Sequence, residues 1–201
     1  LRGLSVISGF RSIAPFKQFV LVQLKGVHIG DAALCLSGLF KEEVPANILS
    51  FLIRSVGRVS LSNSRKIVMA LSDIFGQSAF EDSNEVFCLL IEGYMKSDIT
   101  QKLNFAEPLY SYIKEAKSFN ADAISALLRL LMEELTRKPP EYAHLHFDVY
   151  LLGALLLRKL LSIEVVDECV STMSSLLVQN EESFFSSACL FFNTLIKIDM
   201  E

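Results

Sequence analysis

No stretch of this 201-residue sequence is long and apolar enough to cross a lipid bilayer. The longest uncharged apolar stretches, 149–157 and 184–196, are shorter than the roughly 18 to 20 residues that a transmembrane helix needs. Hydrophobic residues nevertheless make up 51% of the chain, which excludes a disordered protein. Such an apolar chain is expected to leave apolar surface that a partner covers. We therefore expect a subunit of a larger assembly with no membrane span.

Metal-binding and catalytic motifs are missing as well. The four cysteines form no close pair and lie far from the three histidines, so the spacing of a zinc or redox site is absent. His144 and His146 are two residues apart and would point about 200° apart on a helix. The sequence contains neither a glycine-rich phosphate loop nor a nucleophile elbow. We expect a protein that is not an enzyme and that binds neither a metal nor a cofactor.

Acidic residues are absent from the first thirty positions, which contain two Arg, two Lys and three Ser. This composition is typical of organelle transit sequences or of the mature end left after cleavage, and a fragment of a longer chain explains the missing initiator Met equally well. The asymmetry extends further: residues 1–72 carry nine basic and three acidic residues, whereas 73–201 carry ten basic and twenty acidic ones. The split indicates an anionic partner near the N-terminal half, and the start predicts a mitochondrial location.

Strand-like alternation of apolar and polar residues is absent, and apolar residues recur at helical spacing almost throughout. Short polar residues such as Asn120 fall where helices are expected to begin, and Pro108 is expected near a helix boundary. Ten helices are predicted, joined by turns so short that neighbouring helices run antiparallel. Their approximate ranges are 12–26, 30–42, 45–58, 62–76, 82–97, 100–117, 120–138, 141–160, 163–179 and 182–199.

An internal repeat supports a specific architecture. The segment Leu36-Ser37-Gly38-Leu39-Phe40 recurs 35 positions later as Leu71-Ser72-Asp73-Ile74-Phe75. A period of 35 to 45 residues built from helix pairs is typical of an α-solenoid, in which each pair is stabilised by stacking on the next. We predict an all-α fold of about five antiparallel helix pairs. The chain is expected to be a single helical-repeat domain, 1–201, with a basic N-terminal segment and first helix over 1–26 and the repeat array over 27–201.

The second copy of the repeat carries a family resemblance. Its entry, Val59-x-Leu61-x-Asn63, and the following residues 67–74 resemble the degenerate repeats of FAST kinase-like and RAP-domain proteins and of octotricopeptide arrays. The resemblance covers about residues 27–135, and HEAT-like repeats share the same helix-pair period. It implies contact with RNA in mitochondria or plastids, and in some members a place in an organellar ribosome. No terminal domain of the RAP type is visible, and no base-reading residue carries over.

One group of side chains is a candidate RNA-binding site. No acidic residue lies between Val44 and Ser72, and four cations fall in that interval. We call this group the basic edge; it consists of Arg54, Arg58, Arg65 and Lys66. Arg54 and Arg58 share a helix face at i, i+4, and the other two are expected to open the next helix. Such clusters supply much of nonspecific nucleic-acid affinity, although a solvated edge or a surface for an acidic protein is an equally good explanation.

These observations lead to one functional hypothesis and one rival. The first is a non-enzymatic helical-repeat scaffold in a mitochondrial ribonucleoprotein, such as a divergent ribosome or an RNA-processing complex, with its basic half near RNA and its acidic half against other protein subunits. The rival is a HEAT-like protein–protein adaptor without RNA contact. Because apolar residues such as Phe191, Phe192 and Ile196 stand close to the C-terminal end of the sequence, the isolated chain is expected to associate.

Overall fold

The fold is described by a computed structural model that covers residues 14–39, 44–78, 80–137, 142–178 and 182–199. Every named element in these ranges is a helix, so the predicted all-α fold is confirmed there. An isolated bridge between Val44 and Phe80 is the β pairing recorded within the described ranges. The helices are α2 (Ala14–Gln23), α3 (Ile29–Leu39), α4 (Ala46–Ser55), α5 (Leu61–Gly76), α6 (Asn84–Lys96), α7 (Ile99–Glu115), α8 (Ala121–Thr136), α9 (Tyr142–Leu157), α10 (Ile163–Val178) and α11 (Glu182–Asp199).

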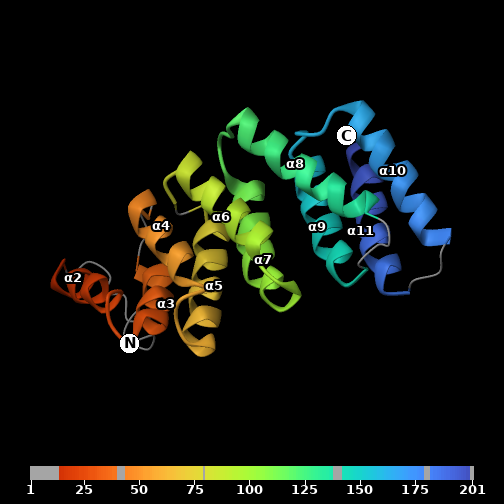
Figure 1. The fold of residues 1–201 in the computed structure, drawn as a ribbon. Helices are drawn as coiled ribbons and strands as arrows, with labels where there is room; N and C mark the ends of the chain where they lie inside the picture. The colour runs from red at the N-terminus through yellow and green to blue at the C-terminus, as the bar shows by residue number, and fades with distance from the viewer. Residues whose placement is uncertain (1–13, 40–43, 79, 138–141, 179–181, 200–201) are drawn as a thin grey trace.

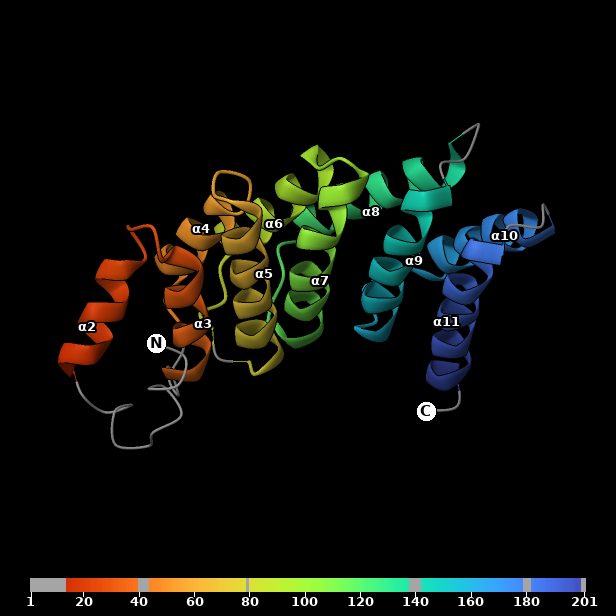
Figure 2. The same cartoon turned by 90° about the horizontal axis from the view of Figure 1, so that it is seen from below.

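The helices form two layers that run along the length of the molecule (Figures 1 and 2). In one layer α3, α5, α7, α9 and α11 lie side by side, and each packs against the next. In the other layer α4 packs against α6, α6 against α8, and α8 against α10. Each even-numbered helix also packs against the odd-numbered helix that follows it, as short connections require. The predicted packing of adjacent helices in pairs is therefore confirmed.

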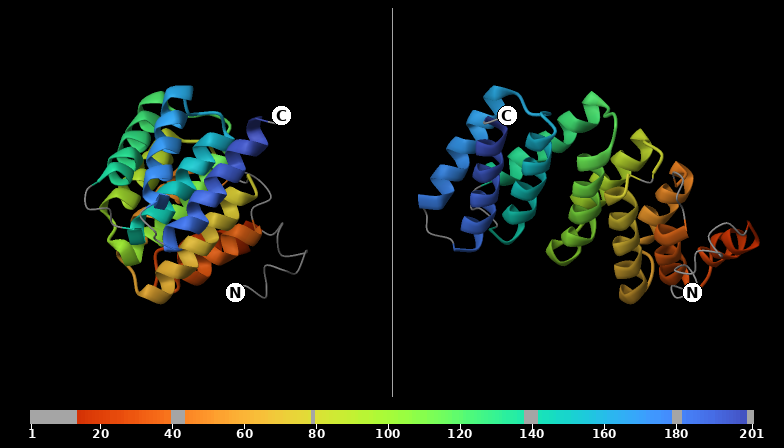
Figure 3. Two further views of the ribbon diagram at one scale, coloured as in Figure 1. Left: turned by 90° about the vertical axis from the view of Figure 1, so that its right-hand side faces the viewer. Right: turned by 180° about the vertical axis from the view of Figure 1, so that it is seen from behind.

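Different helices lie at the two ends of this arrangement. At the N-terminal end, α2 packs against α3 (Figure 1). At the C-terminal end, α10 and α11 lie in front of the other helices when the molecule is viewed end on (Figure 3, left). The described parts of the first and last helices thus lie at opposite ends of the arrangement (Figure 1).

Hydrogen bonds between successive helix pairs join residues that lie 31 to 54 positions apart, most often 35 to 37. The odd-numbered helices from α3 onward begin at residues 29, 61, 99, 142 and 182, which are 32, 38, 43 and 40 residues apart. Among the described residues, six hydrogen bonds link residues separated by 35 to 37 positions. Leu36 and Leu71, the first residues of the repeated segment, are both buried on the neighbouring helices α3 and α5. Phe40 lies outside the described residues.

Local sequence explains most helix boundaries. Asn120 caps α8 as predicted, since its side-chain oxygen accepts hydrogen bonds from the backbone N–H groups of Asp122 (2.8 Å) and Ala123 (3.1 Å). The prediction for Pro108 was wrong, because this residue lies inside α7 and not near its boundary. Pro108 is buried, and α7 packs against α5, α6 and α9. Tertiary packing therefore stabilises α7 despite the backbone hydrogen bond that proline cannot donate.

The core between the layers is rich in aromatic rings. Tyr112 of α7 lies at the centre, with its ring centroid 5.3 Å from that of Phe75, 5.0 Å from Phe80 and 5.4 Å from Phe87. Its hydroxyl donates to the Ser83 carbonyl and accepts from the Ser83 N–H, both at 3.1 Å. This cluster connects α5, α6 and α7 with the loop that precedes α6.

Three tyrosines are expected to make the free energy of unfolding depend on pH in the alkaline range. Burial is the main cause that raises the pKa of Tyr94 and of Tyr112, and it raises that of Tyr150 to about 12. Because each folded-state pKa lies above the unfolded value near 10, the neutral phenols stabilise the fold fully below pH 10. This stabilisation is lost as the pH rises through the folded-state values. We expect tyrosinate absorbance and loss of helical circular dichroism to rise together above pH 10. Ionisation of all five tyrosines near pH 10 with the helices intact would contradict this expectation.

Candidate nucleic-acid interface

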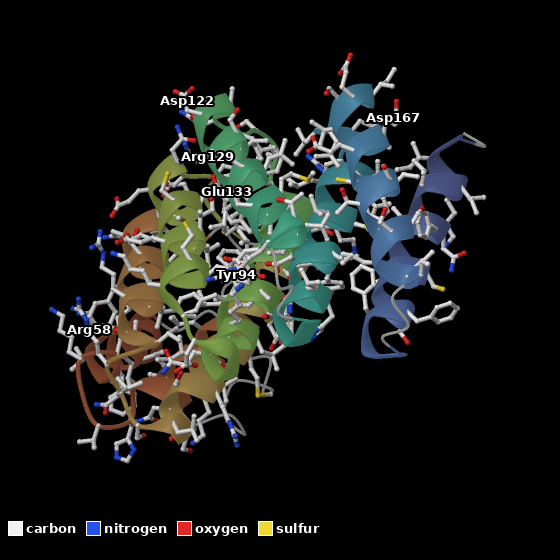
Figure 4. All side chains as sticks on the ribbon, turned by 45° about the vertical axis from the view of Figure 1, so that its right-hand side comes forward. Arg58, Tyr94, Asp122, Arg129, Glu133 and Asp167 are labelled. Carbon is white, nitrogen blue, oxygen red and sulfur yellow. The ribbon has the colours of Figure 1, made fainter. Side chains whose placement is uncertain are left out.

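The basic edge spans the junction between α4 and α5. Arg54 is in the last turn of α4, Arg58 follows that helix, and Arg65 and Lys66 are in α5. Arg54, Arg58 and Arg65 are exposed, and Lys66 is half-buried. Arg58 projects from the surface of the molecule, far from Asp167 at the other end (Figure 4). All four cations thus lie at or near the surface.

Two members of the basic edge form ion pairs with different neighbours. A nitrogen of the Arg54 guanidinium lies 3.2 Å from a carboxylate oxygen of Glu85 on α6. Lys66 turns to α3, where its Nζ donates to Asp31 Oδ1 at 2.8 Å. This hydrogen bond is the main cause that lowers the pKa of the Asp31 carboxyl. Within the described residues no ion pair involves Arg58 or Arg65.

Arg54 and Arg58 also border a groove between α4, α6 and α7. The groove has a volume of about 340 Å³ and an apolar floor that includes Ile53, Leu89 and Phe105. Lys96, which sequence reasoning missed, completes its charged rim together with Glu92. Lys96 forms an ion pair with Glu92 one helical turn away. The repeat could have identified it, because Lys96 follows Arg58 by one repeat length of 38 residues.

A glycine allows the close approach of two helices at this groove. A Cβ atom at Gly93 would lie 2.2 Å from Cε1 of the Phe105 ring, far inside a normal contact. The ring of Phe105 can therefore cover α6 only because position 93 has no side chain. At Gly57, on the opposite side of the groove, no atom lies within 4 Å of the added Cβ.

Surface charge changes sign along the layer of even-numbered helices. Exposed Arg54 and Arg58 mark the N-terminal end, and α8 in the middle exposes Asp122, Arg129 and Glu133 (Figure 4). At the C-terminal end α10 contains three exposed acidic residues and no basic one. These are Glu164, Asp167 and Glu168. The charge split predicted from the sequence therefore corresponds to a gradient along the molecule.

A second polar group lies in the core and was not found from the sequence. It consists of Tyr94 on α6, Lys102 on α7 and Asp148 on α9, which we call the buried trio. The Tyr94 hydroxyl donates to Asp148 Oδ1 at 2.5 Å, and Lys102 Nζ lies 3.6 Å from the same oxygen. Lys102 Nζ also lies 4.8 Å from the centroid of the Tyr94 ring. Since all three side chains are enclosed, with Tyr94 drawn deep among the ribbons in Figure 4, the trio connects helices and does not face a substrate.

The remaining candidate features were assessed within the described residues. They contain no cluster of three metal-binding side chains, and none of their helices has the length and apolarity of a bilayer span. Helix α11 contains two pairs of adjacent phenylalanines, 184–185 and 191–192. Phe184 and Phe191 are buried, whereas Phe185 is exposed. The side chain of His144 lies outside the described set.

Comparison with known proteins gives no relative from which a role can be inferred. The chain matches no family model, no curated protein and no solved structure. Its function must therefore be argued from its own residues.

Proposed function

We propose that this chain is an α-solenoid scaffold subunit of a mitochondrial ribonucleoprotein, without enzymatic activity, and that it contacts RNA through the basic edge. The observation that carries the proposal is the charge gradient, with exposed Arg58 and Arg65 at one end and acidic α10 at the other. The solenoid assignment is supported by the two helix layers and by hydrogen bonds between residues that lie 35 to 37 positions apart. The mitochondrial location is supported by the acid-free first thirty residues.

RNA contact is compatible with the ion pairs of the basic edge. The Arg54 and Glu85 side chains are 52% and 60% exposed, and surface pairs of this kind contribute at most about 1 kcal/mol. Phosphate oxygens can replace such a carboxylate, and binding then gains from counterion release. The resemblance of residues 27–135 to organellar RNA-associated repeats favours the same partner.

A protein–protein adaptor without RNA contact is the second candidate. The pairing of Arg54 with Glu85 and of Lys66 with Asp31 favours it, because both cations already have carboxylate partners. An adaptor would use the basic edge to bind an acidic protein surface.

Charge reversal of the basic edge separates the two candidates. Replacing Arg54, Arg58, Arg65 and Lys66 with Glu should remove up to four phosphate contacts. Each lost contact lowers the slope of log affinity against log salt by roughly 0.7 to 0.9, so the slope should fall by about three. The measurement is RNA binding by the purified chain across a salt series, with circular dichroism to verify helicity.

A matched control reverses the same amount of charge elsewhere. Lys114, Arg129, Arg137 and Lys197 are exposed cations outside the basic edge, and their replacement with Glu gives the same net charge. RNA binding that weakens equally in both variants would indicate attraction by net charge alone and would contradict a defined site. No RNA binding by the unmodified chain would favour the adaptor.

A further inference from the structure

The groove between α4, α6 and α7 has cations on the side of α4 and on the side of α6. Arg54 and Arg58 border it at the end of α4, and Lys96 borders it at the end of α6. All three side chains are exposed, and Arg58 projects from the surface (Figure 4). Glu92 also lies on the rim, where it pairs with Lys96. An anionic chain that crosses the groove would therefore meet a cation on each side.

Between these cations the floor of the groove is apolar. Ile53 and Phe105 are buried there, and Leu89 is half-buried. The volume of about 340 Å³ is near the lower end of the roughly 300 to 1,000 Å³ that sites for small organic groups have. A phosphate or a free ion gains nothing from an apolar floor, because it would have to give up water there. The floor therefore favours a flat group with little polarity on its faces.

A glycine keeps the α4 side of this groove open. Gly57 lines the groove, is exposed, and stands next to Arg58 in the chain. A Cβ atom at this position would meet no other atom within 4 Å. Within the described residues no glycine has a positive φ, so the backbone at position 57 does not require glycine. A larger side chain would fit the fold here and would occupy space that is now open.

Cations around an apolar floor match the chemistry of single-stranded nucleic acid. Proteins bind single strands through grooves that are positively charged along the phosphates and that offer apolar or aromatic contacts to the bases. In a duplex the bases are paired and stacked, and the major groove of A-form RNA is too deep and narrow for side chains to enter. A duplex could therefore meet Arg58 and Lys96, but it could not place a base on Leu89.

We propose that this groove holds one unpaired base of single-stranded RNA, with the neighbouring phosphates at Arg58 and Lys96. The proposal rests on the proposed RNA contact through the basic edge and specifies which kind of RNA binds there. The side chains of Ile53, Leu89 and Phe105 have no hydrogen-bonding group that could read the edge of a base. Binding therefore depends on the presence of an unpaired base and not on its identity.

The ion pair on the rim is compatible with this occupant. The side chains of Lys96 and Glu92 are 75% and 54% exposed. Exposed pairs of this kind are weak, so a phosphate oxygen can compete with the carboxylate for Lys96. Lys96 is not part of the basic edge, so the groove extends the proposed contact from α4 to α6.

Three RNA probes separate contact with a base from contact with phosphates. An oligouridylate offers unpaired bases, an abasic strand of the same length offers the same phosphates without bases, and an RNA duplex offers phosphates with its bases enclosed. The measurement is fluorescence anisotropy with each labelled probe at one fixed salt concentration, because affinity for RNA depends on salt.

Two leucine variants of the full chain test the groove without changing its charge. Gly57→Leu fills part of the open space beside Arg58. Gly76→Leu is the matched control: Gly76 is the last residue of α5, it is exposed, and a Cβ there also meets no atom within 4 Å. Gly76 does not line the groove. Circular dichroism verifies that both variants are folded.

The expected result has three parts. The unmodified chain binds the oligouridylate about tenfold more tightly than the abasic strand, which is within the range that one base on an aromatic or apolar surface contributes. Gly57→Leu loses this difference while its affinities for the abasic strand and the duplex stay the same. Gly76→Leu binds all three probes like the unmodified chain.

Equal affinity of the unmodified chain for the two single strands would overturn the base site. RNA contact through the basic edge would then still stand, because the abasic strand retains the phosphates. This comparison needs no variant, so it decides the proposal even if Gly57→Leu does not fold. A folded Gly57→Leu that keeps the tenfold difference, or a Gly76→Leu that loses it, would overturn the base site as well.

Absence of binding to all three probes would overturn both this proposal and the proposed function. A peptide of alternating Glu and Leu serves as the remaining probe, because it offers carboxylates in place of phosphates and apolar side chains in place of bases. Binding of this peptide without binding of RNA would assign the groove to an acidic protein partner.

Discussion

Replacing Asp148 with alanine is expected to destabilise the protein by about 3 to 5 kcal/mol, measured by urea denaturation. Asp148 is fully buried, and its carboxylate is the anion that faces Lys102, whose side chain is only 7% exposed. Without the carboxylate, the Lys102 ammonium must be buried without its counter-charge or lose its proton, and the Tyr94 hydroxyl loses its acceptor. The large cost follows from the groups left behind, not from the strength of the ion pair itself.

A triple variant provides the control for this prediction. Tyr94→Phe, Lys102→Met and Asp148→Leu together remove every polar group of the buried trio while conserving approximate volume. Replacing a complete buried ion pair with apolar residues is often neutral or stabilising. We therefore expect the triple variant to be clearly more stable than Asp148→Ala. A single variant that loses less than about 1 kcal/mol, or a triple variant that is less stable than it, would contradict the role assigned to the trio.

The second large effect is expected at Tyr112. Truncation to alanine leaves a cavity among Phe75, Phe80 and Phe87 and should cost about 3 to 5 kcal/mol in the same measurement. Tyr112→Phe is the matched control, because it preserves the ring and removes only the hydroxyl that bonds to Ser83. Its expected cost is about 1 kcal/mol. Equal costs for the two variants would locate the stabilisation in the hydrogen bonds and contradict the importance of ring packing.

Local sequence features account for what could be predicted of the fold. Helical spacing of apolar residues predicted the ten helices named in the described part of the chain, and Asn120 marked the beginning of α8. These signals act within one helix, so they do not say which helices lie beside each other. The partners of α9 illustrate the limit: residues 149–157 are apolar on every side because α9 packs against α7, α8 and α11. Asp148, at the start of that stretch, meets Tyr94 from 54 positions away.

The candidate site was predictable in its composition and only partly in its geometry. The interval without acidic residues located Arg54, Arg58, Arg65 and Lys66 in the sequence. The carboxylates that pair with two of them come from other helices, Glu85 from α6 and Asp31 from α3. A charge count along the chain cannot detect such pairing, because the partners lie 31 and 35 residues away.

The packing of each helix pair on its neighbours has a consequence for how the molecule opens. When each helix pair contacts only its neighbours, stability is a sum of local terms, and the cost of opening depends on position along the row. The pairs at the two ends lose one junction when they open, whereas α6, α7 and α9 must also give up the enclosed contacts of Tyr94, Lys102 and Asp148. Amide hydrogen exchange should accordingly be slowest around α7 and fastest in α2 and α11, so that the molecule opens progressively from its ends toward its centre.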